Sequence, residues 1–158
     1  MKTTIVFHRT VARLQRGAVA VEFALIAAFF LLALLFGIIE LGRAFFYMNA
    51  TAEATRLGAR IAVVCEKGAT DGYIRARMRE FVNVLPDANI AIQWEPANCT
   101  ADGPTLCRSV TVSVLPGATF DTFIPFVPLT WTLPPFATTL PRESMQSTVD
   151  GASNPVCN

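Results

Sequence analysis

Histidine and charge are both scarce in this 158-residue chain. Charged residues make up 16% of the sequence, and thirteen basic residues against twelve acidic ones give a net charge of +1. A chain with so little net charge has no overall field that attracts nucleic acid, so no nucleic acid is expected among its partners. The one histidine, His8, lies near the N-terminus.

Sequence motifs for catalysis and metal binding are also missing. There is no glycine-rich phosphate-binding loop, and no two cysteines have the CxxC spacing of zinc sites. The acidic residues of the C-terminal half are scattered singly, so nothing draws two carboxylates together. We therefore predict neither an enzyme nor a bound cofactor or metal ion.

What the sequence does contain is one long apolar run, Ala18–Ile39, in which Glu22 is the single charged residue. As an α-helix its 22 residues would be about 33 Å long, slightly more than the ~30 Å hydrocarbon core of a bilayer. A secretory signal has a shorter apolar region of about 7–15 residues, followed by a cleavage site. The run therefore predicts a transmembrane helix over residues 18–41.

A basic segment precedes this predicted span. Four basic residues and no acidic one give residues 1–17 a charge of +4, whereas the rest of the chain carries −3. Because basic flanks stay in the cytoplasm, we expect a cytoplasmic leader over 1–17 and a C-terminal part outside. His8 would then be separated by the membrane from every cysteine, which excludes a Cys-His catalytic pair.

All four cysteines follow the predicted span and would lie in an oxidising compartment. Cys99 and Cys107 flank residues 100–104, whose turn residues favour a disulfide between these two cysteines. Cys65 and Cys157 would then pair and join the end of the first helix to the C-terminus. Four cysteines allow three pairings, and a zinc site is the alternative, although its usual spacing is missing.

The first helix is expected to continue beyond the membrane. No proline interrupts residues 18–64, and apolar residues recur at steps of three and four past the span. Glu40 and Arg43 are expected to be interfacial anchors at the outer membrane edge, and Gly68 is expected to end the helix. The predicted buried face consists of Tyr47, Ala50, Ala54, Leu57, Ile61 and Val64, and the solvated face carries Glu53, Arg56 and Arg60.

The remaining sequence predicts a small head with a second helix and several strands. The helix should run from Asp71 to about Val84, with Arg75 facing water. Its predicted apolar face consists of Ile74, Met78, Phe81, Val82 and Leu85. The predicted strands are Ile90–Trp94, Ser109–Leu115, a broken hairpin over Phe120–Leu133 cut by Pro125 and Pro128, and a strand within Phe136–Val149.

These elements predict an α+β fold in which two helices pack against an antiparallel sheet of three or four strands. The expected parts are a leader (1–17), a transmembrane helix (18–41), its amphipathic continuation (42–68) and a disulfide-braced head (69–158). Trp94 and Trp131 are expected to serve in packing, and the tail Ser153–Asn158 to be irregular.

Three sequence blocks, Ala20–Leu25, Gly37–Gly42 and Glu53–Arg60, are similar in order and spacing to those of the TadE-like pseudopilins. This family belongs to the tight-adherence (Flp, type IVb) pilus system. In addition, Gly17 followed by four residues and Glu22-Phe23 resembles the prepilin processing site of that system, with Phe23 in place of the tyrosine of the major pilins.

The resemblance implies a pilin-like fold and cleavage between Gly17 and Ala18 by a membrane prepilin peptidase. Glu22 and Phe23 would then serve in subunit packing. Implied partners are other pilin and pseudopilin subunits, the inner-membrane assembly platform and the lipid bilayer. The implied location is the bacterial inner membrane, crossed once, with possible incorporation into a surface pilus.

Two other interpretations stay open. The first is an uncleaved single-span anchor whose head binds a partner in the envelope or the secretion apparatus. The second is a domain released by an ordinary signal peptidase beyond residue 40, against which the unbroken helical pattern counts.

Overall fold

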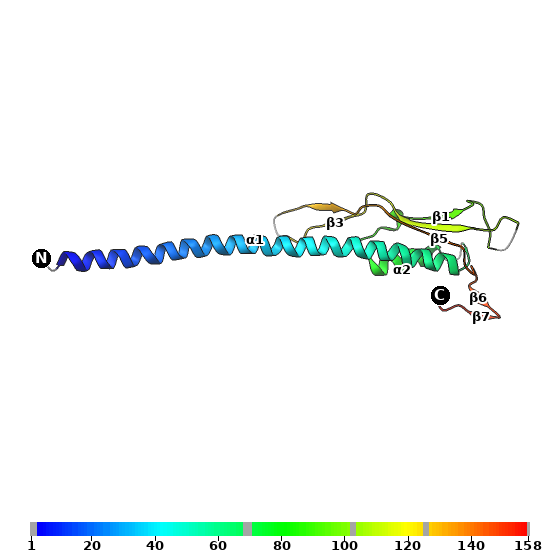
Figure 1. The fold of residues 1–158 in the computed structure, drawn as a ribbon, viewed down its shortest axis with the longest axis horizontal. Helices are drawn as coiled ribbons and strands as arrows, with labels where there is room; N and C mark the ends of the chain where they lie inside the picture. The colour runs from blue at the N-terminus through cyan, green and yellow to red at the C-terminus, as the bar shows by residue number, and fades with distance from the viewer. Residues whose placement is uncertain (1–2, 68–70, 102–103, 125–126, 158) are drawn as a thin grey trace. The chain divides into compact units, whose positions relative to one another are not determined.

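The computed structural model describes residues 3–67, 71–101, 104–124 and 127–157, with side chains from Gly17 onward. The first element is the helix α1, Thr3–Val64, shown in blue to green in Figure 1. It ends four residues before Gly68, which lies outside the described residues, and Cys65 N–H still donates to the Ile61 carbonyl over 2.9 Å. The chain divides into two compact units, Met1–Gly42 and Arg43–Asn158, called here the span unit and the head.

The centre of the head is a three-stranded antiparallel sheet with the order β1-β2-β5. Its strands are β1 (Ile90–Glu95), β2 (Ser109–Val114) and β5 (Phe136–Pro141). In β2 the three valines are buried and the Ser and Thr residues between them are half-buried, as the alternating sequence predicted. Side chains at successive strand positions point to opposite faces, so the valines form the core side of the sheet.

The second helix, α2 (Asp71–Phe81), and the head part of α1 complete the core. Ile74 and Met78 are the buried residues of α2, and both lie close to Gly58 of α1, as does Val112 of β2. The α+β prediction is thus confirmed, with a long apolar helix, a second helix, antiparallel sheets and two disulfides.

The second helix is shorter than predicted and uses fewer of its apolar residues. It ends at Phe81, whose side chain is exposed, while Val82 and Leu85 are buried in the segment that follows. Arg75, predicted to face water, donates instead to the carbonyls of Asp87 and Ile90. These carbonyls lie at either end of the 3₁₀ turn Asp87–Asn89, so Arg75 satisfies backbone groups of the turn that leads into β1.

The later strands form separate small sheets rather than extending the central one. A two-stranded sheet pairs β3 (Thr119–Asp121) with β4 (Thr130–Thr132), which is the broken hairpin of the prediction. A second pairs β6 (Thr148–Val149) with β7 (Ala152–Ser153), so the prediction of an irregular tail is wrong at Ser153. Prolines explain the interruptions, because proline has no N–H to donate to a ladder; Pro125 itself lies outside the described residues.

Two disulfides close the end of the head at which α1 finishes. Cys65 pairs with Cys157 and Cys99 with Cys107, the pairing that the sequence analysis favoured. Lys67, just past α1, donates its ammonium group to the Cys99 carbonyl over 2.7 Å and lies 5.8 Å from the Trp94 ring centre. The loop closed by Cys99 and Cys107 therefore lies at the end of the head opposite Arg43, where the head part of α1 begins.

Candidate functional site

The predicted cleavage site lies on a continuous stretch of helix. Gly17 and Ala18 are both part of α1, and both are exposed. A Cβ atom built on Gly17 would meet nothing within 4 Å, so no contact within the described chain requires glycine there.

Glu22 lies one helical turn beyond Ala18. Residues four apart share a helix face, so Glu22 and the Ala18 backbone lie on the same side of α1, about 6 Å apart along its axis. Glu22 is exposed, and the neighbouring Phe23 side chain is 72% exposed. The structure therefore brings Ala18 and Glu22 together and leaves Glu22 and Phe23 uncovered.

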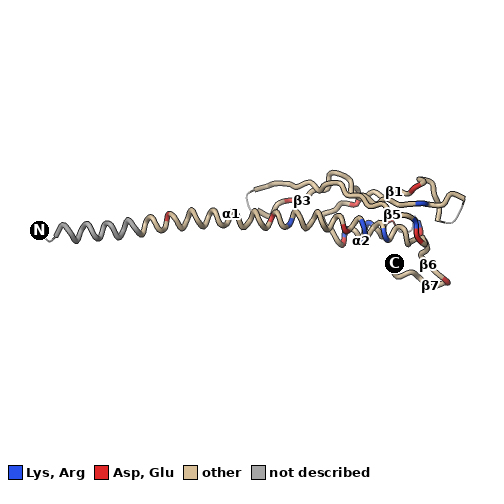
Figure 2. The backbone as a smooth tube through the Cα atoms, viewed as in Figure 1, with Lys and Arg blue, Asp and Glu red and all other residues tan. Residues whose placement is uncertain are grey.

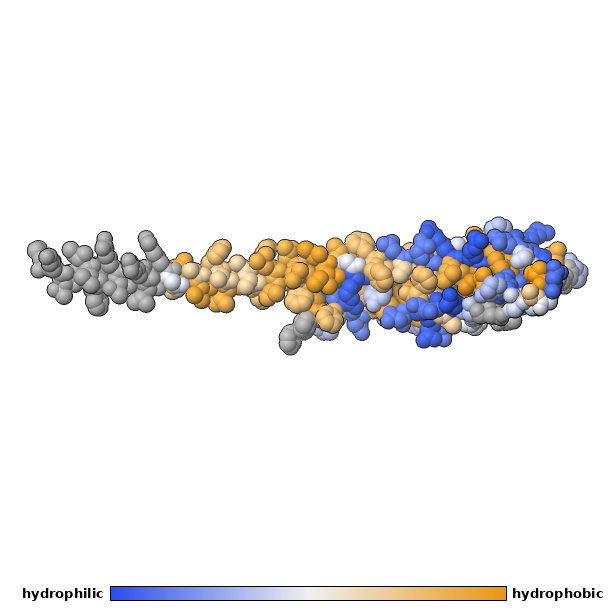
Figure 3. Space-filling view, turned by 90° about the horizontal axis from the view of Figure 1, so that it is seen from below, coloured by the Kyte–Doolittle hydropathy of each residue, from blue (hydrophilic) through white to orange (hydrophobic). Residues whose placement is uncertain are grey.

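The span unit exposes many large apolar side chains, and exposing so much apolar surface to water would be unfavourable. None of its most apolar window is buried, and it is the one helix in the described part of the chain that is long and apolar enough to cross a membrane. Figure 3 shows hydrophobic residues along the visible face of this helix, and Figure 2 shows that Lys, Arg, Asp and Glu gather in the head. Such a surface fits lipid or other apolar helices.

The two charged residues at the predicted outer membrane edge differ in their exposure. Glu40 is 6% exposed, and its role as an interfacial anchor remains a prediction. Arg43 lies 6.0 Å from the Tyr47 ring centre and donates to the Asp121 carbonyl over 3.5 Å. This bond ties the start of the head helix to the strand β3.

The third sequence block, Glu53–Arg60, has one face in the core and one in solvent. Glu53 and Arg56 form an exposed ion pair, and Arg60 is exposed as predicted. Ala54 and Ala59 are fully buried, which lets the α1 backbone approach the sheet and α2. The block is thus a docking face of small residues, backed by charges that keep the other face in water.

Sequence reasoning missed three buried residues in and next to this docking face: Thr51, which precedes the block, and Thr55 and Gly58 within it. The Thr55 hydroxyl lies 3.0 Å from that of Thr138 in β5 and also donates to the Ala52 carbonyl. Threonine and glycine do not count as apolar, so hydrophobic periodicity skips them. Small residues at steps of three and four were the signal that could have found them.

Comparison with known protein families decides what these N-terminal features belong to. The family model described as TadE-like protein matches residues 17–60. Residues 17–60 are a TadE-like domain. The match begins at Gly17 and runs through the span and the docking face, so it includes all three sequence blocks. No curated protein and no solved structure was found to match the chain.

The TadE-like domain implies a protein associated with the tight-adherence pilus that has an N-terminal membrane helix. The family is structural rather than enzymatic. Among the described residues, no three His, Cys, Asp or Glu side chains gather where they could hold a metal ion.

Proposed function

We propose that this chain is a minor pilin or pseudopilin that acts in the biogenesis of a tight-adherence pilus. The observation that carries the proposal is the TadE-like domain, whose match begins at the glycine of a prepilin-like processing motif. The exposed apolar helix that follows supports it, because nothing in the described chain covers that surface.

Cleavage between Gly17 and Ala18 would create a charged amino group at Ala18. A carboxylate in hydrocarbon costs roughly 2.5–3.5 kcal/mol at the centre of a bilayer and less near its edge. The Glu22 carboxylate of one subunit would neutralise the Ala18 amine of a neighbouring one, and pairing lowers the burial cost of both groups when their geometry is good. The motif thus links processing to assembly: without the cut there is no amine for Glu22 to meet.

The span offers two different faces to its neighbours. Ala18 and Glu22 lie on one side of the helix, and at 100° per residue Ala20, Ala24 and Ala27 lie on the opposite side. Small residues let helices approach closely. A subunit with two unlike faces packs head to tail, which generates open filaments when the rotation between subunits does not close into a ring.

The remaining parts of the proposal concern location and partners. The basic leader favours a cytoplasmic N-terminus and a head outside the inner membrane. The partners would be a prepilin peptidase, other pilin and pseudopilin subunits, and the inner-membrane assembly platform. The head would act by presenting a surface, without catalysis.

Charge substitutions at Glu22 test the assembly role. Glu22→Lys should abolish piliation while membrane insertion and protein level stay normal, because two cations then face each other between subunits. Glu22→Gln should impair assembly less. Glu53→Lys, a charge reversal at an exposed head residue, is the matched control and should leave piliation intact. Normal piliation with Glu22→Lys would instead favour an uncleaved single-span anchor.

A further inference from the structure

The hairpin that joins β3 to β4 exposes large apolar side chains at its end. Phe123 is 74% exposed, Leu129 54% and Val127 40%. The segment from Thr122 to Pro141 contains no charged residue. Exposed apolar surface without charge is typical of a binding surface rather than of a solvated loop.

This hairpin end lies at the end of the head where the head part of α1 begins. The Phe120 ring is 4.7 Å from that of Tyr47, and the next residue, Asp121, accepts a hydrogen bond from Arg43. The strand therefore runs along α1 towards the start of the head helix, and the residues after Asp121 continue in that direction (Figure 1). Arg43 itself is two residues past the predicted end of the span at Leu41.

The same end of the head exposes two further aromatic residues on α1. Phe45 is 56% exposed and Phe46 64% exposed, and they lie two and three residues after Arg43. Together with Phe123, Val127 and Leu129 they are named here the apolar collar. Aromatic side chains are enriched where membrane proteins cross the interface between lipid and water.

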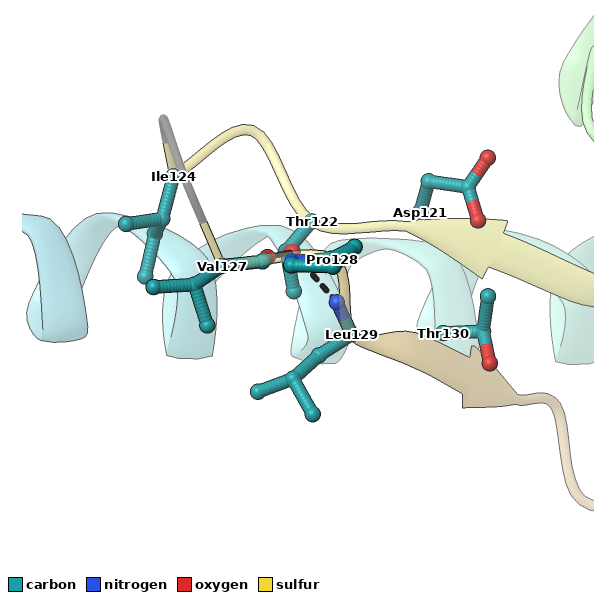
Figure 4. A pocket seen from close by; sticks show the side chains of 7 residues that line it. All are labelled: Asp121, Thr122, Ile124, Val127, Pro128, Leu129 and Thr130. Atoms are coloured by element: carbon teal, nitrogen blue, oxygen red, sulfur yellow. Dashed lines mark hydrogen bonds between the residues drawn. The ribbon is translucent and has the colours of Figure 1, made fainter.

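Several hydrogen bonds close the described part of the hairpin end. Thr122 N–H donates to the Leu129 carbonyl over 2.9 Å, and the Thr122 hydroxyl donates to the Val127 carbonyl over 2.7 Å. Leu129 N–H also lies 3.3 Å from the Thr122 hydroxyl (Figure 4). Leu129 N–H donates to the Val127 carbonyl, and Val127 N–H to that of Ile124. Each backbone group paired in this way needs no water, which lowers the cost of moving that group into an apolar layer.

We propose that the apolar collar inserts into the outer interfacial layer of the bilayer that holds the span. The inference rests on the membrane anchoring of the proposed function and adds a second, reversible lipid contact. Lipid is the occupant that the observations favour, because the collar lies at the end of the span, lacks charge and is rich in aromatic residues. Such a contact would fix the height and tilt of the head, and the collar would have to leave the lipid before the subunit enters a filament.

Quenching by lipid tests the proposal with a matched pair of variants. In the full chain carrying Trp94→Phe and Trp131→Phe, a single tryptophan is introduced by Leu129→Trp or by Leu106→Trp. Both leucines are exposed, at 54% and 48%, but Leu106 lies in the disulfide loop beside Lys67, at the other end of the head. The distance from Arg43 to Val64 along α1 is about 32 Å, so the control residue is well clear of the membrane.

Each variant is placed in nanodiscs of phosphatidylcholine with brominated acyl chains and compared with ordinary lipid. Interfacial apolar groups sit roughly 5–10 Å into the headgroup and acyl boundary, so we expect Leu129→Trp to lose about half of its emission and Leu106→Trp almost none. Alkylation followed by mass measurement shows whether the Leu129→Trp variant forms both disulfides. If it does not, Phe123→Trp serves as the second reporter.

Three outcomes overturn the proposal. The first is equal, weak bromolipid quenching of both variants, and the second is equal quenching of both by aqueous iodide. The third is protection of Leu129→Trp from iodide without bromolipid quenching, which would assign the collar to another subunit. Resistance to carbonate extraction is measured in parallel: a chain that is extracted contradicts the proposed function itself, whereas an inserted chain with an unquenched collar contradicts this inference alone.

Discussion

Replacing Gly58 with alanine tests how α1 is seated on the rest of the head. A Cβ atom at this position would lie 2.8 Å from Met78 Sδ and 3.2 Å from both Ile74 Cγ2 and Val112 Cγ1. These three residues are fully buried, so none of them can move aside into solvent. The alanine methyl group must therefore displace the Met78 side chain within the core or push apart α1, α2 and the central sheet.

The expected change in the free energy of unfolding combines two opposing effects. Overpacking of a well-packed core costs about 1–3 kcal/mol. Alanine in place of glycine within a helix regains roughly 0.5–1 kcal/mol. Gly58→Ala should thus lower the free energy of unfolding by up to about 2 kcal/mol, and Gly58→Val should lower it further because valine adds volume and favours helix less.

Gly72→Ala is the matched control for the helix term. Gly72 lies in α2, and a Cβ atom there would meet nothing within 4 Å. This variant should be neutral or slightly stabilising, so the difference between the two alanine variants isolates the overpacking term of about 1–3 kcal/mol. The assay is urea unfolding of the full chain in detergent micelles, with the disulfides intact and Trp94 fluorescence as the signal. Equal free energies of unfolding for the two variants would refute the packing of α1 described here.

Three further predictions concern the stability of the head, each measured by the same urea unfolding. Replacing both Cys65 and Cys157 by serine should destabilise the head more than replacing Cys99 and Cys107, because the first disulfide closes a segment of 92 residues and the second one of 8. The chain-entropy model gives losses in the free energy of unfolding of about 4.6 and 2.5 kcal/mol as upper values. The reverse order of stability would contradict the prediction. Thr55→Val should cost about 1 kcal/mol by breaking the hydroxyl pair with Thr138, and Thr138→Val should add little to it, whereas full additivity would exclude a direct bond. Arg75→Met should cost about 1–3 kcal/mol by leaving the Asp87 and Ile90 carbonyls without their donor, and an unchanged midpoint would contradict that role.

The helices and the core strands could be predicted because their patterns are strong and local. The absence of proline over residues 18–64 predicted one long helix, and the alternating valines of Ser109–Val114 predicted a strand with one buried face. Ile74 and Met78 were predicted to face the core and do so. In the strand and in the second helix, apolar residues repeat at the spacing that places them on one face of the element.

The features that the sequence did not reveal depend on contacts between distant segments. The exposure of Phe81 follows from where α2 ends, and the role of Arg75 depends on two carbonyls that a turn brings within its reach. The division into separate small sheets depends on which edges remain free after prolines interrupt the chain. The burial of Thr51 and Thr55 follows from close packing of the docking face, which hydrophobicity alone does not register.

The candidate functional residues also divide into those that the sequence identified and those that it did not. Gly17, Ala18, Glu22 and Phe23 were identified from their spacing, and their roles in cleavage and packing remain predictions. The apolar collar was not predicted at all, because its members come from two segments of the chain that are joined by the contacts of Arg43 with Asp121 and of Tyr47 with Phe120.

The most direct test of the proposed function is the N-terminal residue of the protein extracted from membranes, determined with and without the cognate prepilin peptidase. We predict a start at Ala18 that depends on the peptidase, with a mature chain in which Glu22 is the fifth residue. A chain that begins at Met1 in the presence of the active peptidase would contradict processing, and with it the assembly role proposed for Glu22.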